Sequence, residues 1–164
     1  MQNRFPQTFE NITEYEPIEP MQIQFGYSVI QGGRQNTEDY ADVQALTTRG
    51  FLPLTVGIVA DGVGGNVFGE EAAKETVETA LRYIQASPLS DPNGIPTLLE
   101  FALIEANRRV IQRSRTEREK LGMASTAIVA AIYENLLFIA NVGDSRAYIV
   151  KPDALVQLSL DHSW

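Results

Sequence analysis

The most constraining feature of this sequence is an apolar run that stops at a carboxylate and is followed by glycines. Residues 52–60 read LPLTVGIVA, Asp61 follows directly, and Gly62, Gly64 and Gly65 come within the next four positions. Such a uniformly apolar run is typical of a strand buried on both faces. Glycines after the strand let the backbone approach other groups closely. An acid at the end of a buried strand costs free energy unless it is paired or bound to a cation, so Asp61 is a candidate functional residue.

Apolar periodicity on both sides of this junction predicts strands and helices. Residues 21–30 alternate between apolar and polar side chains, and residues 40–46 form a second run, which predicts two strands before the 52–60 strand. After the glycines, we expect a helix over residues 69–86 and another from about residue 97 to residue 120, which Gly122 ends. The residues expected on the buried faces of these helices are Ala73, Val77, Ala80, Leu81, Ile84, Leu99, Leu103, Ala106 and Val110.

Three further strand candidates follow the helices. Residues 124–133 and 135–144 are apolar and are joined by a turn at Glu134 and Asn135. Residues 145–150 are the expected hairpin partner of the 135–144 strand, and residues 154–164 close the chain. Strands, then helices, then strands, without a repeat, predict helices packed on antiparallel sheet in an α+β fold.

Length, charge and composition limit the classes of function. The 164 residues indicate one domain over residues 21–164, behind a flexible, polar arm at residues 1–20. The net charge of −8 argues against nucleic acid and anionic membrane as partners, since both attract Lys and Arg. The sequence has no cysteine and a single histidine, His162, which excludes thiolate zinc sites and His-rich metal sites. No stretch resembles a signal peptide or a membrane span, so we expect a cytoplasmic protein.

Four acidic residues, Asp61 included, lie at predicted strand ends. Glu38 and Asp39 follow the first predicted strand at a polar turn, and Asp144 ends the strand that begins at residue 135. If these strands are neighbours in one sheet, the acids converge at one edge. Oxygen donors without Cys or His favour Mg²⁺ or Mn²⁺, and the flexible backbone lets the Gly62 carbonyl join them as a ligand.

Arg34 precedes Glu38 by four positions in the same polar turn. Its guanidinium fork matches phosphate oxygens, and metal-binding carboxylates with one arginine suit the hydrolysis of a phosphate ester. Taken singly, each of these residues is also an ordinary turn or surface residue. The spacing therefore leaves two interpretations open, a phosphoesterase site and a set of structural turns.

Four blocks of sequence are more informative together than singly. They are GYSVIQGGRQNTED, VADGVGGNVFGEEAA, GMASTAIVAAIYENLLFIANVGDSRAYIV and QLSLDHSW. In this order they resemble the N-terminal part of the catalytic domain in bacterial metal-dependent Ser/Thr protein phosphatases, the PPM or type 2C family. The resemblance covers about residues 24–164.

That resemblance implies a four-layer sandwich of two antiparallel sheets flanked by helices, incomplete here, with two Mn²⁺ or Mg²⁺ ions at one edge and a third, weaker metal site. Asp61 would be a catalytic residue that bridges two metals, and the Gly62 carbonyl would bind one of them. Glu38 and Asp39 would hold metal-bound waters. Asp144 would correspond to the aspartate of the third site.

The resemblance also implies the reaction and its partners. Water activated at the metal centre would hydrolyse phosphoserine and phosphothreonine, and Arg34 would bind the substrate phosphate. The partners would be phosphorylated proteins and a cognate Ser/Thr kinase pathway; hydrolysis of small phosphate esters is a further reading. Ser125 and Thr126 would be core packing, and His162 would stabilise a turn.

Two metal-binding aspartates of the family, in its SDG and DN blocks, have no counterpart in these 164 residues. We therefore expect a fragment of a longer phosphatase, with impaired activity in this chain alone. The alternative is a truncated, non-catalytic half-domain that binds a phosphoprotein or a partner chain. Weak Mn²⁺ binding without hydrolysis would favour that alternative.

Overall fold

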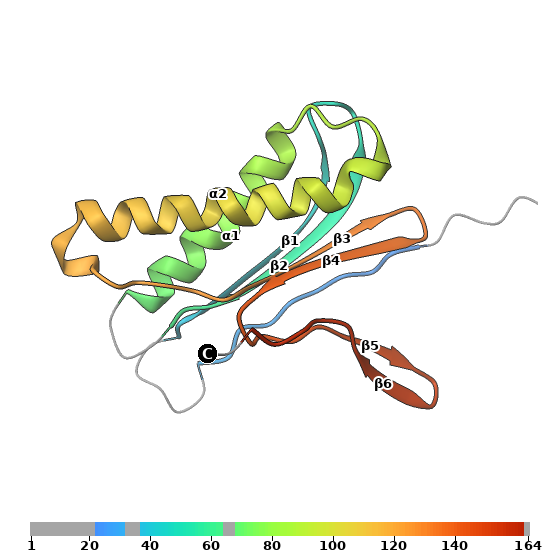
Figure 1. The fold of residues 1–164 in the computed structure, drawn as a ribbon. Coiled ribbons are helices and arrows are strands. Elements are labelled where there is room, and N and C mark those ends of the chain that lie inside the picture. Colours follow the sequence, from blue (N-terminus) through green and yellow to red (C-terminus); the bar gives the residue numbers. More distant parts are fainter. Residues whose placement is uncertain (1–21, 32–36, 64–67, 163–164) are drawn as a thin grey trace, which may run out of the picture.

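The computed structural model describes residues 22–31, 37–63 and 68–162. These residues form a four-stranded sheet, a two-stranded hairpin and two long helices (Figure 1). The strands are β1 (Asp39–Thr47), β2 (Pro53–Asp61), β3 (Ala127–Tyr133), β4 (Leu136–Val142), β5 (Tyr148–Lys151) and β6 (Ala154–Gln157). The helices are α1 (Gly69–Ala86) and α2 (Ile95–Thr116), with short 3₁₀ helices η1 (Pro92–Gly94) and η2 (Arg118–Lys120). The predicted arm at residues 1–20 lies outside the described residues.

The four-stranded sheet is antiparallel throughout, in the order β1-β2-β3-β4. Its register sets Asp39, the first residue of β1, opposite Asp61, the last residue of β2. The turn between β3 and β4 lies at Glu134 and Asn135, as predicted, and Glu134 adopts a φ of 51°. One end of the sheet therefore gathers the start of β1, the end of β2, the start of β3 and the end of β4.

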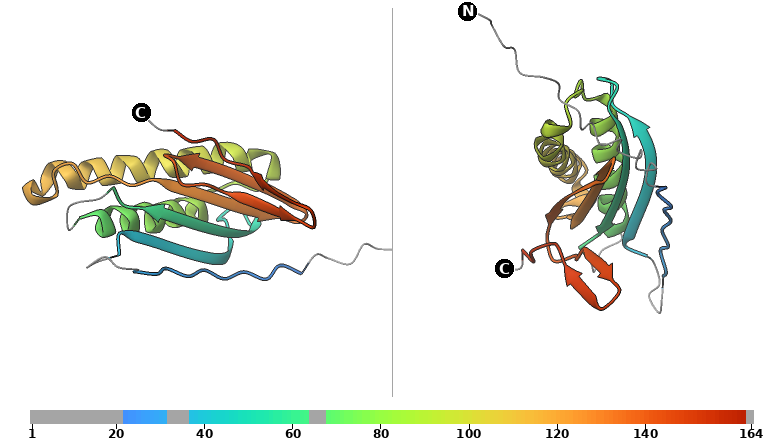
Figure 2. Two further views of the ribbon diagram at one scale, coloured as in Figure 1. Left: turned by 90° about the horizontal axis from the view of Figure 1, so that it is seen from below. Right: turned by 90° about the vertical axis from the view of Figure 1, so that its right-hand side faces the viewer.

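Both helices cover the same face of this sheet (Figure 2). α1 has the predicted bounds, and the five residues predicted for its buried face are at most 6% exposed. α2 begins at Ile95 and ends at Thr116, while the last residues of the predicted helix form η2 instead. Leu99 and Leu103 of α2 join Val56 of β2 in the main hydrophobic core. Neither described helix has an apolar stretch that could cross a membrane.

The opposite face of the sheet is more open. Along β2, Val56, Ile58 and Ala60 are buried against the helices, whereas Val59 is 49% exposed. The prediction that this strand is buried on both faces is therefore wrong, because the described helices cover one face alone. Residues 22–31 run along the other side of the sheet in extended form (Figure 2).

Two strand predictions are wrong. Residues 22–31 alternate in polarity but form no strand, since they make no sheet pairing within the described ranges. Residues 145–150 do not pair with β4; β5 pairs with β6 instead. The chain turns away after β4 because Gly143 adopts a φ of 95° and the Ser145 hydroxyl bonds to Thr126.

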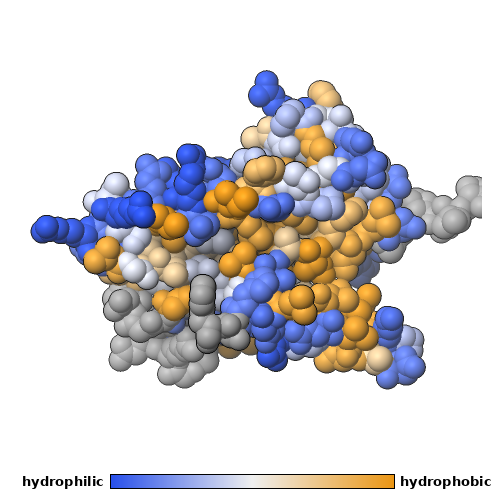
Figure 3. All heavy atoms as spheres, viewed as in Figure 1, coloured by the Kyte–Doolittle hydropathy of each residue, from blue (hydrophilic) through white to orange (hydrophobic). Residues whose placement is uncertain are grey.

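The hairpin of β5 and β6 projects away from the helices (Figure 1). An ion pair fastens its base, where Arg146 Nε donates to both carboxylate oxygens of Asp161 at 3.0 Å. These bonds from Arg146 hold the pKa of Asp161 below its ordinary value. Apolar side chains gather on the hairpin and over β3 and β4, while the end of α2 is hydrophilic (Figure 3).

Candidate active site

Asp39 and Asp61 lie opposite each other where β1 begins and β2 ends. Opposite partners in an antiparallel pair point to the same face, with their Cβ atoms usually about 4.5–5.5 Å apart. Alternate residues of a strand share a face, so Asp61 lies on the face of exposed Val59, away from the helices. Like charges directly opposite each other destabilise a sheet. The pair therefore suits a bound cation.

Glu38 and Gly62 bring a third carboxylate and a backbone carbonyl to this region. The Gly62 amide donates to the Glu38 carbonyl at 3.0 Å. A Cβ added at Gly62 would lie 2.1 Å from the Gly69 carbonyl oxygen, so any other residue would require backbone movement. A Cβ at Gly69 would lie 3.3 Å from both Glu38 Cγ and the Gly62 oxygen. Gly62 thus permits the close backbone approach that the sequence predicts, and it packs against the first residue of α1.

Ser125 and Thr126, predicted as core packing, also hold the main chain of Asp61. The Thr126 amide donates to the Asp61 carbonyl at 2.8 Å, and the Asp61 amide donates to Thr126 Oγ1 at 3.1 Å. The Ser125 hydroxyl donates to the same carbonyl at 3.1 Å. Sequence reasoning missed this role. The sequence feature that could have indicated it is the pair of hydroxyl residues directly before an apolar strand.

Gly143 and Ser145, the two neighbours of Asp144, both contact Thr126 at this end of the sheet. The hydroxyls of Ser145 and Thr126 lie 2.7 Å apart and share a hydrogen bond. A Cβ at Gly143 would lie 2.7 Å from Thr126 Cγ2, and its positive φ also favours glycine. The His162 amide donates to the Gly143 carbonyl at 2.9 Å, so the main chain of His162 stabilises this turn.

Not every predicted site residue is placed. Arg34 lies outside the described residues, as do the glycines Gly64 and Gly65 that follow Asp61 in the sequence. Across the described ranges, no three Asp, Glu or His side chains form a group that could hold a metal ion. The sheet therefore pairs Asp39 with Asp61, but the described residues do not form the carboxylate cluster of a complete metal centre.

The donor atoms in this region are oxygens, which is the type of ligand that hard divalent cations bind. Asp39 and Asp61 are exposed carboxylates, and the Gly62 carbonyl lies one residue further along the chain. Mg²⁺ and Mn²⁺ prefer oxygen ligands of this type. These residues would supply part of the coordination shell of such an ion.

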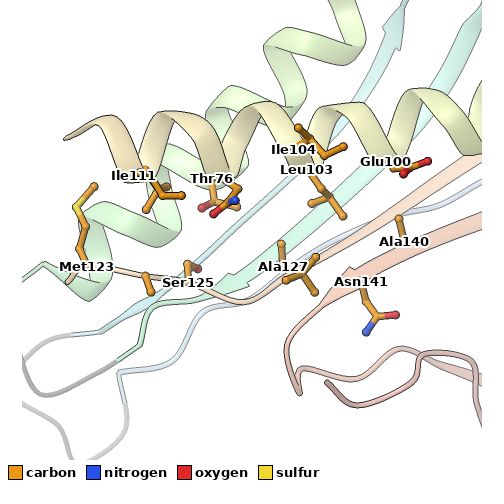
Figure 4. Close-up of a pocket in the computed structure, with 14 residues that line it drawn as sticks. Thr76, Glu100, Leu103, Ile104, Ile111, Met123, Ser125, Ala127, Ala140 and Asn141 are labelled. Atoms are coloured by element: carbon orange, nitrogen blue, oxygen red, sulfur yellow. The ribbon is translucent and has the colours of Figure 1, made fainter. Parts of the chain in front are cut away.

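A groove of about 540 Å³ lies apart from these carboxylates (Figure 4). One wall is α2, with Leu103 and Ile104, and the other includes Ser125 and Ala127 at the start of β3. The groove lies on the helix side of the sheet, whereas Asp61 points to the other side. We therefore do not assign it as the active site.

Most of the chain matches a single protein family. The sequence profile of the family described as protein phosphatase 2C matches residues 25–163. The chain belongs to the protein phosphatase 2C family. The matched residues include every predicted site position, from Arg34 to Asp144.

Curated relatives of this protein phosphatase 2C chain include bacterial enzymes. The chain is 34% identical over 107 residues to the serine/threonine phosphatase stp of Listeria innocua. That match covers 65% of this chain and 42% of the relative. The chain thus spans about two fifths of the length of the curated relative that it matches.

Solved structures share the fold. The serine/threonine phosphatase Stp1 from Staphylococcus aureus superposes with a TM-score of 0.72 at 25% identity, over 89% of this chain and 59% of that one. The catalytic domain of the phosphatase PstP, in complex with two manganese ions, gives a TM-score of 0.64 at 25% identity, over 78% of this chain and 50% of that one. The predicted α+β class, with antiparallel sheets and flanking helices, is confirmed.

Proposed function

We propose that the protein containing this chain is a metal-dependent phosphatase of phosphoserine and phosphothreonine in proteins. The observation that carries the proposal is the opposition of Asp39 and Asp61 at one end of the sheet, in a chain of the protein phosphatase 2C family. Family membership supports the reaction class, and the paired carboxylates supply oxygen donors for cations. The likeness to a phosphatase structure with two manganese ions supports Mn²⁺ as a cofactor.

We assign the metal-binding roles to the acids at this end of the sheet. Asp61 would help to hold both of two Mn²⁺ or Mg²⁺ ions, and the Gly62 carbonyl would help to hold one of them. Glu38 and Asp39 would hold water in the site, and Asp144 would serve a third, weaker cation. When bound, the divalent cations would supply an activated water and would neutralise charge on the phosphoryl oxygens.

The rest of the fold would hold Asp61 in place before substrate binds. The amide of Thr126 and the hydroxyl of Ser125 fix the Asp61 carbonyl at 2.8 and 3.1 Å. A carboxylate whose backbone is already fixed needs little reorganisation on binding a cation or a phosphate. The described contacts therefore support a preorganised Asp61.

Substrate binding would involve Arg34, which lies outside the described residues. Its guanidinium would hold the substrate phosphate through two parallel hydrogen bonds. The phosphorylated proteins that serve as substrates require a kinase that makes them, so we propose a place in signalling opposite a cognate Ser/Thr kinase. The cytoplasm is the compartment that we propose for this pair.

A second candidate is a non-catalytic module that binds a phosphoprotein or a partner chain. The observation that favours it is the lack of a three-carboxylate group among the residues that the structure describes. This candidate predicts weak Mn²⁺ binding and no hydrolysis.

The test is a phosphatase assay on the intact native gene product with a phosphothreonine peptide and Mn²⁺. Loss of a metal ligand should cost more than the 10–100-fold typical of its supporting residues, so Asp61→Asn should lower kcat by at least about a hundredfold. The matched control is Asp42→Asn on the neighbouring strand β1, because Asp42 bonds to the adjacent Val43 amide and the Gln44 side chain. The control should keep the activity of the unsubstituted protein.

Three outcomes separate the candidates. Full activity in Asp61→Asn would reject the site assignment. No hydrolysis by the unsubstituted protein, together with weak Mn²⁺ binding, would favour the binding module. Hydrolysis of p-nitrophenyl phosphate without any action on the phosphopeptide would replace protein substrates with small phosphate esters.

A further inference from the structure

A cluster of ion pairs at the start of α1 has no part in the site described so far. α1 contributes Glu71 and Glu75, the end of α2 contributes Arg113, and the segment after it contributes Glu117 and Lys120. Glu71 and Glu75 lie one turn apart on α1, so they present two carboxylates to the same neighbours. The cluster joins three parts of the chain.

Lys120 is the most buried cation of this cluster, with 8% of its surface exposed. Its Nζ donates to Glu71 Oε2 and also pairs with Glu117 Oε2. The same Nζ lies 6.0 Å from the centroid of the Phe68 ring, within reach of a cation–π contact. A buried ammonium is costly unless it is paired, so these contacts fix where Lys120 can lie. The hydrogen bonds from Glu117 and Glu71 raise the pKa of Lys120, which keeps it charged.

Arg113 extends the cluster across the two helices. Its Nη2 and Nη1 donate to Glu71 and Glu75, each at 2.8 Å, and its Nε donates to Glu117 at 3.3 Å. One guanidinium therefore holds the carboxylates of both Glu71 and Glu75. Lys120 adds the connection from α1 to the chain that leads into β3.

That chain leads directly to the residues that hold Asp61. The Met123 amide donates to the Lys120 carbonyl at 3.1 Å, and Met123 packs with Phe68 at the start of α1. The Val63 amide donates to the Ala124 carbonyl at 2.9 Å. Residues 120–126 thus run from the ion cluster to the hydrogen bonds around Asp61.

The Asp61 turn is held between two parts of the fold. Lys120 belongs to one of them and contacts the other. One is the segment of residues 120–126, whose backbone bonds to Asp61 and Val63. The other is the start of α1, where Glu71 and Phe68 contact Lys120 and where Gly69 packs against Gly62. Loosening one of these contacts would let the two structures move apart.

We propose that Lys120 is a positioning residue that locks residues 120–126 to the start of α1 and thereby fixes the main chain at Asp61, Gly62 and Val63. Only its effect on metal binding rests on the proposed function. The effect on the backbone is a property of the fold. The competing explanation is that Lys120 stabilises the whole molecule evenly.

The test compares three variants of the intact protein. Lys120→Met removes the charge and keeps the length of the side chain, and Lys120→Arg keeps the charge. Lys74→Met is the matched control, because Lys74 is exposed on α1 and pairs with Glu78 at the outer limit of 4.0 Å. Amide hydrogen exchange is measured by NMR at Val63 and at Val129, a core residue of β3, and Mn²⁺ affinity is measured by calorimetry.

A positioning role predicts a local effect. In Lys120→Met, exchange at Val63 should accelerate at least about tenfold more than at Val129, and Mn²⁺ should bind about tenfold more weakly, as for other residues that orient metal ligands. Lys120→Arg should restore most of both losses, and Lys74→Met should change neither.

Several results would overturn the proposal. Equal acceleration at Val63 and Val129 in Lys120→Met would show an even stabilising role. Unchanged exchange at both residues with unchanged Mn²⁺ affinity would show that Lys120 does not position the Asp61 turn. If the unsubstituted protein binds no Mn²⁺, the proposed function is wrong. The proposal for Lys120 is then tested only by comparing the acceleration of amide exchange at Val63 with that at Val129. If Lys120→Met does not fold, Glu71→Gln weakens the same pair, and its exchange ratio decides by the same criterion.

Discussion

Thr126 is the residue that connects the two halves of the candidate site. Its Oγ1 accepts the Asp61 amide at 3.1 Å and shares a hydrogen bond of 2.7 Å with Ser145 Oγ. Thr126 is 9% exposed, so water has little access to replace these bonds. A single side chain therefore links the Asp61 turn to the turn that carries Asp144.

Replacing Thr126 by valine tests this connection. Valine keeps the shape of threonine but leaves the Asp61 amide and the Ser145 hydroxyl without their partner. An unmade buried hydrogen bond costs about 1–3 kcal/mol, so Thr126→Val should lower the free energy of unfolding by about that amount, measured with urea. Thr47→Val, at the exposed end of β1, should change it by less than about 0.5 kcal/mol. Equal stability of Thr126→Val and the parent would contradict the assigned bonds.

The sequence could predict that Asp61 ends a strand, but not which residues hold its main chain. A strand that ends at Asp61 and a strand that starts near Asp39 are visible as local patterns, and pairing them sets the two acids opposite each other. The partner of the Asp61 amide lies 65 positions away, at Thr126. Nothing in the local pattern distinguishes that hydroxyl from ordinary core packing.

Between elements, Glu75 is the carboxylate that joins α1 to α2. Burial raises the pKa of Glu75, but hydrogen bonds from Arg113, Thr79 and Arg109 outweigh burial and hold that pKa below its ordinary value of 4.5. The folded state therefore favours the ionised carboxylate. Its contribution to stability is complete above the unfolded pKa and is lost as the pH falls through the folded pKa.

Glu75→Gln should remove this pH-dependent contribution. Near pH 7 the variant should be about 1 kcal/mol less stable than the parent, because a carboxylate that accepts hydrogen bonds from two guanidinium groups is replaced by a neutral amide. The difference should shrink once the pH falls below the ordinary value of 4.5. Urea unfolding across this pH range is the measurement. Glu78→Gln, on the exposed side of α1, is the control, and a pH-independent difference for Glu75→Gln would reject the explanation.

Helices were easier to predict than strand pairings, for a physical reason. The apolar positions of α1 recur within one helix, so its bounds follow from local sequence. A strand is defined by its partner, and the partner of β5 depends on the turn at Gly143 and on the Arg146–Asp161 pair beyond it. The expected pairing of residues 145–150 with β4 ignored these longer contacts.

At the scale of the whole molecule, the β5–β6 hairpin carries an exposed apolar surface. Val150 and Leu155 lie opposite each other on β5 and β6 and are 79% and 65% exposed. Exposed apolar side chains of β4 add to the surface beside this hairpin (Figure 3). A contiguous apolar surface of this kind marks an interaction site or a tendency to associate. Within the part of the chain that the structure describes, β5 and β6 pair only with each other, so their outer edges add to that tendency because their backbone groups can pair with another chain.

The 164-residue chain should therefore self-associate as its concentration rises, and the hairpin should be one of the contact surfaces. Replacing both Val150 and Leu155 with threonine keeps strand-forming side chains and removes most of the apolar surface at this pair. The double variant should give a smaller average mass by light scattering than the parent at equal concentration. Leu121→Thr removes a similarly exposed side chain in a loop, where it adjoins no strand edge, and should leave the mass unchanged. If the parent chain stays monomeric at the highest soluble concentration, the exposed hairpin is tolerated in water, and the link between this surface and association is wrong.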